Sequence, residues 1–285
     1  MRYGLNLVPV QPHELVDAGR RAEQAGFESL WIGEHVIVPF ELRSRYAGGT
    51  GKPPFRPDSR FVEPFTALAH LAAVTTTIRL GTGVVIVPLH SPFHLARAVA
   101  TADVLSGGRL LLGVGVGWME DEYRIVGQGW EDRGARMDEA LVVLDALWNE
   151  PAPALDGRFF SFPNVGFEPK PVQRPHPPLL VGGASPAALR RTARVGDGWY
   201  GGNQHPDEVA TAADELTRLR KEYGRDHLPF EITVTTGWGD GFDAELEQAY
   251  AAAGVDRIVT TPWARSSEAL AAIDAFADAA RLRGG

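Results

Sequence analysis

Short apolar runs and amphipathic segments alternate along all 285 residues of the chain. Runs such as Tyr3–Val8 and Arg109–Val114 are short and dominated by apolar residues, a pattern typical of strands. The segment Pro12–Ala25 carries apolar residues three and four positions apart, a spacing that places them on one face of a helix. This alternation predicts repeated units of one strand followed by one helix.

Eight predicted strands alternate strictly with eight predicted helices. The strands are Tyr3–Val8, Glu28–Ile32, Ile78–Val85, Arg109–Val114, Pro178–Val181, Gly198–Gly201, Phe230–Thr235 and Arg257–Thr261. The helices are Pro12–Ala25, Pro64–Thr76, Pro92–Leu105, Arg136–Trp148, Pro186–Val195, Pro206–Tyr223, Asp243–Ala253 and Ser267–Arg281. Such alternation implies parallel strands, and eight units in a chain of this length predict an α/β fold closed as a (β/α)8 TIM barrel.

Two long segments interrupt this order. Val36–Phe61 follows the second strand, and Trp148–Pro178 follows the fourth helix. Long irregular segments in a compact domain are usually lids, binding loops or interface elements. No change of composition marks a domain boundary, so we expect a single domain over residues 1–285.

Composition and charge exclude several classes of function. The chain has no cysteine, which excludes disulfides, thiolate catalysis and metal sites built on cysteine. Its formal net charge is −8 and its basic residues are scattered, so nucleic-acid binding is not expected. The N-terminus lacks the features of a signal peptide, and no apolar run reaches the roughly 20 residues that cross a bilayer. We therefore expect a cytoplasmic protein without membrane contact.

Glycine and tryptophan are frequent where the predicted strands end. The active site of a (β/α)8 barrel lies at the carboxyl ends of its strands. Glycines there allow a ligand to approach the backbone closely, and Trp118, Trp238 and Trp263 offer planar apolar surfaces. These features favour a flat aromatic cofactor with a phosphate tail. The alternative is that the glycines serve only the turns and the tryptophans only the core.

The clearest local motif follows the fifth strand. Gly182, Gly183, Ala184 and Ser185 are small, and Pro186 then begins a helix. Free backbone N–H groups and the helix dipole converge at such a point, which is how barrels bind phosphate. The alternative is a serine that only caps the helix.

Two other motifs fail on their spacing. The glycine-rich run Gly113–Gly117 resembles a dinucleotide-binding fingerprint, but the third glycine would fall on Trp118, and the MEDEYRIVG segment that follows has no immediate helix start. His90 and His94 have a spacing found in metal sites, but a helix begins between them and no acidic residue completes a ligand set. No metal site is predicted.

At these same positions the chain resembles the luciferase-like flavin and deazaflavin oxidoreductases. Within that superfamily it is most similar to actinobacterial-type proteins assigned to coenzyme F420. The similar stretches lie at 22–36, 77–92, 105–123, 133–141 and between 157 and 199. The first 200 residues carry the resemblance densely, and the last third agrees mainly in its barrel pattern.

The resemblance implies roles for individual residues. Glu34 and His35 match an acid–histidine pair near the reactive ring of the cofactor. Gly83 and Val84 match a bulge with a cis peptide that supports the back of the ring. A turn that contacts the ring or the substrate corresponds to Val116, Gly117 and Trp118, and the phosphate loop corresponds to Gly182, Gly183, Ala184 and Ser185. Glucose-6-phosphate dehydrogenases of the superfamily carry a glutamate at the position of Trp118, so that sugar phosphate is not expected as substrate.

These implications lead to one preferred function and two alternatives. The preferred function is hydride transfer between reduced deazaflavin coenzyme F420 and a small organic substrate, with His35 as proton donor or acceptor because histidine exchanges protons near neutral pH. The first alternative is an FMN-dependent monooxygenase that receives reduced flavin from a separate reductase. The second is a flavin-binding barrel without catalysis. The resemblance also implies a homodimer.

Overall fold

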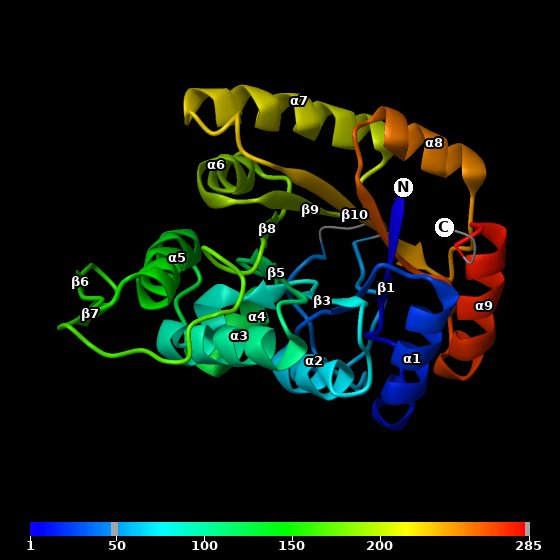
Figure 1. The fold of residues 1–285 in the computed structure, drawn as a ribbon, viewed down its shortest axis with the longest axis horizontal. Helices are drawn as coiled ribbons and strands as arrows, with labels where there is room; N and C mark the ends of the chain where they lie inside the picture. The colour runs from blue at the N-terminus through cyan, green and yellow to red at the C-terminus, as the bar shows by residue number, and fades with distance from the viewer. Residues whose placement is uncertain (47–50, 283–285) are drawn as a thin grey trace.

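The structure is a computed structural model that describes residues 1–46 and 51–282. The barrel strands are β1 (Arg2–Asn6), β2 (Ser29–Ile32), β3 (Arg79–Thr82), β5 (Leu110–Gly115), β8 (Leu179–Gly182), β9 (Gly198–Gly202), β10 (Glu231–Trp238) and β11 (Arg257–Thr261). Strands that follow one another in this order pair in parallel, and β11 pairs with β1, so the sheet closes on itself (Figure 1). The prediction of a (β/α)8 TIM barrel is confirmed.

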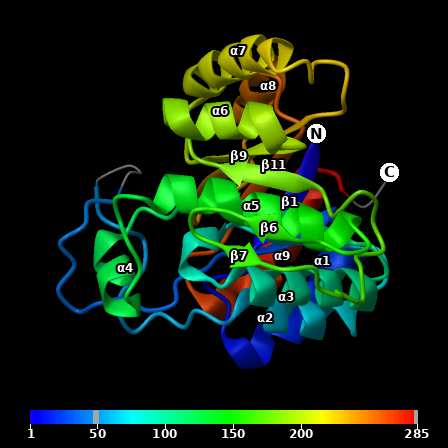
Figure 2. The same ribbon diagram turned by 90° about the vertical axis from the view of Figure 1, so that its left-hand side faces the viewer.

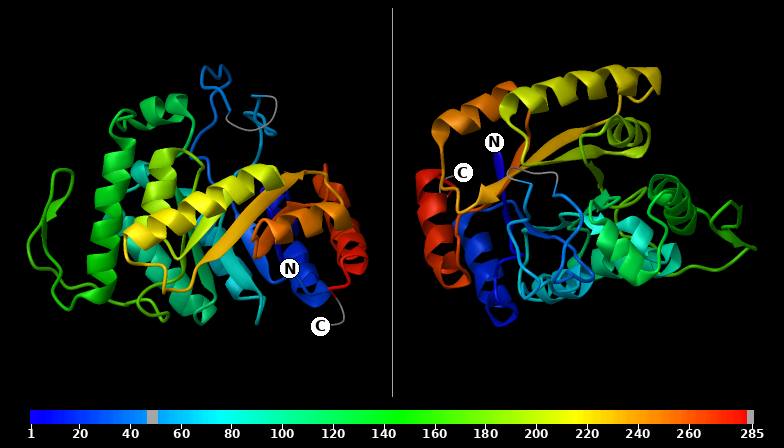
Figure 3. Two further views of the ribbon diagram at one scale, coloured as in Figure 1. Left: turned by 90° about the horizontal axis from the view of Figure 1, so that it is seen from above. Right: turned by 180° about the vertical axis from the view of Figure 1, so that it is seen from behind.

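Helices cover the outside of the barrel, as Figure 3 shows from above and from behind. They are α1 (Leu15–Ala25), α2 (Pro64–Ala72), α3 (Pro92–Ser106), α5 (Arg133–Asn149), α6 (Pro186–Val195), α7 (Pro206–Glu222), α8 (Ala244–Ala252) and α9 (Ala269–Ala279). Each follows the strand predicted to precede it, with shifts only at the ends of elements. Within the described residues, no helix combines the length and the apolar character needed to span a membrane.

The indole ring of Trp31 fills the middle of the barrel. Neighbouring strands carry glycine where its ring lies: a Cβ on Gly4 would be 2.6 Å from Trp31 Nε1, and one on Gly81 would be 2.5 Å from Trp31 Cε3. The indole N–H donates to Ser29 Oγ at 2.8 Å. The same buried cluster contains Leu111, Leu180, Tyr200 and Val259. This cluster fills the interior, so the barrel is a packed core as far as the structure describes it.

An ion network closes the amino-terminal end of the barrel. The side chain of Arg257 is fully buried and lies 2.8 Å and 2.9 Å from the two carboxylate oxygens of Glu28. Its Nη2 is also 3.2 Å from Glu231, which pairs with Arg2 at 2.8 Å. A buried charge is tolerated when it is paired in this way. This end is therefore structural, and a ligand is expected at the opposite end.

Both predicted insertions are present. In the first, residues 36–46 and 51–61 form no helix or strand, and residues 47–50 lie outside the described part. The second, between α5 and β8, contains a short hairpin of β6 (Leu155–Asp156) and β7 (Ser161–Phe162) that projects from the barrel (Figure 1). Lys170 holds this insertion to the C-terminus of α5, because its Nζ donates to the carbonyls of Leu147 and Glu150.

The MEDEYRIVG segment after Trp118, in which the sequence predicts no immediate helix start, does contain a helix. A short helix, α4 (Glu120–Val126), begins two residues later and precedes α5. Its first turn carries three acidic residues, which the positive end of the helix dipole stabilises. Gly127 ends it with a φ of +79°, a conformation that favours glycine. In Figure 2, α4 lies beside the first insertion.

Candidate active site

All predicted site residues lie at the carboxyl ends of four barrel strands. Glu34 and His35 follow β2, and Gly83–Val84 lies between β3 and the short strand β4 (Val85–Ile86). Val116–Trp118 follows β5, and Gly182–Ser185 joins β8 to α6. Since neighbouring parallel strands end on the same side, closure of the barrel brings these segments to one mouth.

His35 is held by a buried glutamate from α4. Its Nδ1 lies 2.9 Å from Glu122 Oε2, and the side chain of Glu122 is 1% exposed. The other carboxylate oxygen accepts the backbone N–H of Val36 at 2.6 Å and of Ile37 at 3.3 Å. With the carboxylate ionised, both oxygens are acceptors, so Nδ1 carries the proton that points to Glu122. Nε2 is then the nitrogen that can exchange a proton with a ligand.

Glu34 belongs to a second, separate pair. One of its carboxylate oxygens accepts the backbone N–H of Ile86 at 2.7 Å, and both lie within 3.0 Å of His90 Nε2. Glu34 and His35 are adjacent in sequence, but they bond to different segments: Glu34 to His90, just before α3, and His35 to Glu122 on α4. The structure therefore contains two glutamate–histidine pairs at this end of the barrel, Glu34–His90 and Glu122–His35.

The pKa of His90 is raised above its ordinary value of 6.5. Burial acts against the charged imidazolium, but the hydrogen bond to Glu34 and the negative charges of Glu34, Glu63 and Glu122 outweigh it. Because the folded state binds this proton more tightly, the pair stabilises the fold below the ordinary pKa. That contribution is lost as the pH rises through the raised pKa.

The Glu34→Gln variant tests this coupling, because glutamine keeps an oxygen for the Ile86 N–H and removes the charge. We expect the His90 titration followed by NMR to move to lower pH in the variant. The difference in unfolding free energy between wild type and variant should be larger at about pH 5.5 than at about pH 8.5. A difference that grows with pH would contradict the assigned pair.

Val84 forms a small apolar floor at the mouth of the barrel. The Gly83–Val84 peptide bond is cis, as the resemblance implies. A Cβ on Gly115 would be 2.8 Å from one methyl group of Val84, and one on Gly182 would be 3.3 Å from the other. A Cβ on Gly83 would lie 2.5 Å from the hydroxyl of Tyr200. Glycine at these positions therefore leaves the half-buried Val84 as the surface that a ligand would meet.

The turn after β5 is fixed by a tyrosine from α4. The hydroxyl of Tyr123 donates to the Val116 carbonyl at 2.5 Å. Gly117 has a φ of +71°, and a Cβ there would be 2.9 Å from Ile86 Cγ2. The turn thus requires glycine at 117, and it presents the half-buried ring of Trp118 to the mouth.

The predicted phosphate loop is exposed and begins a helix. Gly183 has a φ of +104°, and Gly183, Ala184 and Ser185 are exposed. Ser185 caps α6, since its Oγ accepts the backbone N–H of Ala188 at 3.2 Å. A cap at Ser185 is compatible with both interpretations of this motif, and the neighbouring N–H groups at this helix end have the geometry that suits an anion.

Aromatic side chains from the first insertion surround His35. The rings of Phe55 and Phe61 lie 4.8 Å and 5.1 Å from the imidazole, and Trp118 lies 5.8 Å from it. Tyr46 packs edge-on against Trp118 at 5.0 Å. We call Tyr46, Phe55, Phe61 and Trp118 the aromatic box. The sequence pattern identifies Trp118 alone of these, because the other three lie in a segment without periodicity.

Two arginines at the start of α5 add positive charge near this end. Their guanidinium groups lie on aromatic rings, with Arg133 3.5 Å from the centroid of Trp130 and Arg136 4.8 Å from that of Phe159. The Nε atoms of both are buried and have no hydrogen-bond partner among the described residues. Arg191 of α6 donates to a carbonyl in the first turn of α5 at 3.0 Å, so the two helix starts are connected. Both arginines could contact a phosphate.

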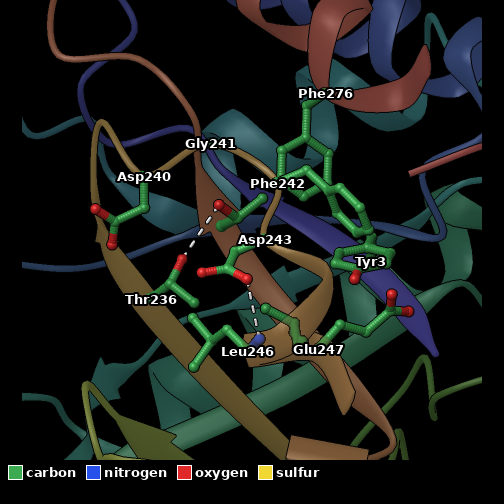
Figure 4. A pocket seen from close by; sticks show the side chains of 11 residues that line it. Tyr3, Thr236, Asp240, Gly241, Phe242, Asp243, Leu246, Glu247 and Phe276 are labelled. Atoms are coloured by element: carbon green, nitrogen blue, oxygen red, sulfur yellow. Dashed lines mark hydrogen bonds between the residues drawn. The ribbon is translucent and has the colours of Figure 1, made fainter. Parts of the chain in front are cut away.

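A separate pocket lies on the outside of the barrel (Figure 4). It is formed between β10, β11, α8 and α9, with Tyr3, Phe242 and Phe276 among its walls. None of the predicted site residues lines it. Trp263 is 1% exposed and packs in the main core, so for this tryptophan the core interpretation is correct.

A closed (β/α)8 barrel with two histidine–glutamate pairs at its carboxyl-terminal mouth is the arrangement of a TIM-barrel enzyme. A family model described as luciferase-like monooxygenase matches residues 2–272. The chain belongs to this luciferase-like family of oxidoreductases and monooxygenases.

Individual relatives are similar over most or part of the chain. An uncharacterized protein of Mycobacterium tuberculosis is 34% identical over 238 residues, which cover 81% of this chain and 78% of that protein. The oxygenase component of a flavin-dependent trigonelline monooxygenase from Acinetobacter baylyi is 30% identical over 175 residues, covering 61% of this chain and 43% of that protein. A solved F420-dependent secondary alcohol dehydrogenase has a TM-score of 0.80 at 16% identity, over 100% of this chain and 99% of that chain. This last likeness concerns the fold.

Proposed function

We propose that the chain is an oxidoreductase that uses coenzyme F420 to transfer hydride to or from a small organic substrate. The observation that carries the proposal is the His35 imidazole, which buried Glu122 holds in one orientation at the barrel mouth. Reduced deazaflavin supplies hydride and reacts poorly with oxygen, so the protein must supply orientation and a proton. His35 meets the second requirement.

The residues at the mouth fit a planar ring with a phosphate tail. Gly115 and Gly182 leave room over Val84, because a Cβ on either would reach the methyl groups of that side chain. The exposed loop before α6 offers backbone N–H groups to a phosphate, and Arg133 and Arg136 could supply positive charge. We assign Val84 to the ring, and the loop to the phosphate.

His35 would hold or deliver a proton through Nε2. The aromatic box lies around the imidazole and separates it from bulk water, which strengthens hydrogen bonds within the site. Glu122 would stabilise the imidazolium when His35 is charged. Glu34 is bonded to the backbone and to His90, so it positions the loop after β4 and does not act on the substrate directly.

The second candidate is an FMN-dependent monooxygenase supplied with reduced flavin by a separate reductase. The flavin-dependent relative from Acinetobacter baylyi favours it. The barrel and the phosphate loop can serve either cofactor. The dense similarity of the first 200 residues to proteins assigned to F420 is our reason for preferring the deazaflavin.

Cofactor binding separates these candidates. We expect F420 to bind with a dissociation constant of about 1 µM or less, and FMN to bind more weakly, in fluorescence-quenching titrations of the same protein under the same conditions. Riboflavin, which lacks the phosphate, is the matched control for the phosphate contribution. Tighter binding of FMN than of F420 would reject the deazaflavin and support the monooxygenase.

A further inference from the structure

We propose that the substrate of this site is a planar, apolar molecule without a charged group at its reacting end, such as an aromatic or conjugated ketone. The inference rests on the proposed function, because it concerns the molecule that meets His35. It goes further in that it assigns the aromatic box to the recognition of the substrate.

The first reason is the geometry of the box. The ring of Phe55 lies 5.1 Å from Phe61 with the planes at 89°, and 6.3 Å from Trp118. All three surround the imidazole of His35 at centroid distances between 4.8 Å and 5.8 Å. Flat faces and edges in this arrangement suit a flat guest, since aromatic rings stack on or meet each other edge-to-face.

The second reason is that the acidic groups nearby already have hydrogen-bond partners. Glu122 is bonded to His35 and two backbone N–H groups, and Glu34 to His90 and one. Asp121 accepts two backbone N–H groups and the hydroxyl of Ser44. A carboxylate or phosphate on the substrate would face these acids, which disfavours an anionic substrate.

The third reason is the apolar surface beside the box. Val36 and Ile37 directly follow His35 and are 53% and 42% exposed, and Phe40 is 91% exposed. Ile125, one turn after Asp121 and Glu122 on α4, is 53% exposed. Glu122 accepts the backbone N–H groups of Val36 and Ile37, so α4 and this part of the first insertion lie side by side at the barrel mouth. Exposed apolar groups that gather in one place usually mark a binding surface.

The test measures binding to the full-length protein by calorimetry, with and without cofactor. Three probes of similar size separate the effect of planarity from the effect of charge. 2-Acetylnaphthalene is planar and neutral, 2-naphthoate is planar and anionic, and 2-decalone is neutral but not planar. We expect 2-acetylnaphthalene to bind at least about tenfold more tightly than either other probe.

Two variants test whether 2-acetylnaphthalene binds in the aromatic box. Phe55→Leu and Phe61→Leu keep apolar volume but remove the ring, and each should weaken 2-acetylnaphthalene by about 2- to 10-fold while F420 affinity stays the same. Circular dichroism and thermal unfolding check that both variants fold. The Ser185→Asp variant should show the opposite result: its affinity for 2-acetylnaphthalene should equal that of the wild type, and its affinity for F420 should be lost.

The inference is overturned by equal or tighter binding of 2-naphthoate, by tight binding of 2-decalone, or by probe binding that both leucine variants leave unchanged. Absence of 2-acetylnaphthalene binding to a protein that binds F420 would also overturn it. A protein that binds the planar probe through Phe55 and Phe61 but neither cofactor would reject the proposed function and keep the aromatic site.

Discussion

The His35→Ala variant is expected to lose turnover by about 100- to 10,000-fold, the range that a positioned proton-transfer group contributes. Cofactor affinity should remain close to that of the wild type, because His35 is placed toward the substrate and the phosphate loop is held by α6. The measurement is kcat with an identified substrate, together with a fluorescence titration of the cofactor. His35→Gln is the matched control, because it keeps a polar side chain that cannot transfer the proton.

Glu122→Gln examines how His35 is oriented. The amide oxygen can still accept the N–H groups of Val36 and Ile37, which leaves the amide NH2 facing Nδ1. That NH2 is a donor, so Nδ1 becomes an acceptor and the proton moves to Nε2. We expect a fall in kcat with little change in cofactor affinity, and a reversed tautomer of His35 in nitrogen NMR spectra.

Unchanged turnover in both His35 variants would remove His35 from the mechanism. Equal loss of cofactor affinity and of turnover would instead indicate that His35 holds the cofactor. Because Glu122 also bonds the backbone of the first insertion, thermal unfolding of its variant must be measured beside the rate.

The barrel could be predicted from the sequence because its signals are local. Apolar runs such as Arg109–Val114 define strands, and Gly26 ends the first helix with a φ of +91° that favours glycine. The common location of the loops after the strands could also be predicted, because every strand of a parallel barrel points the same way. The structure therefore places Glu34, His35 and Ser185 at the predicted end.

The partners of those residues could not be predicted in the same way. His35 and Glu122 are 87 positions apart, and Glu34 and His90 are 56 apart. Which acid meets which imidazole depends on how the segments after different strands pack, and adjacency in the sequence does not reveal it. Glu122 lies on α4, whose seven residues are too few for a clear helical period.

Apart from Trp118, the members of the aromatic box could not be predicted from the sequence either. Phe55 and Phe61 stand in a segment without regular structure, so no periodicity assigns their direction. Only the contacts with His35 and Trp118 reveal that they face the mouth. The length of the insertion indicated a lid or a binding loop, but it did not indicate which side chains face the mouth of the barrel.

The Ser185→Asp variant is expected to lose cofactor affinity by about 10- to 1,000-fold, because it adds a negative charge where we place the phosphate. Two unit charges 4 Å apart repel by about 1 kcal/mol in water and about 4 kcal/mol near a protein surface, which spans that range. The fold should persist. Ser185 caps α6 by accepting the Ala188 N–H, and aspartate is as good a capping residue as serine.

Ser185→Asn is the matched control for this variant, since asparagine caps equally well and has nearly the same shape as aspartate without its charge. We expect fluorescence titration to give wild-type affinity for the asparagine variant and greatly weakened binding for the aspartate variant, with equal melting temperatures. Raising the salt concentration should narrow the gap between the two, because ions screen the repulsion at this exposed loop. If both variants bind the cofactor like the wild type, the phosphate does not lie at the start of α6. We would then assign phosphate binding to Arg133 and Arg136, because their buried Nε atoms have no hydrogen-bond partner among the residues that the structure describes.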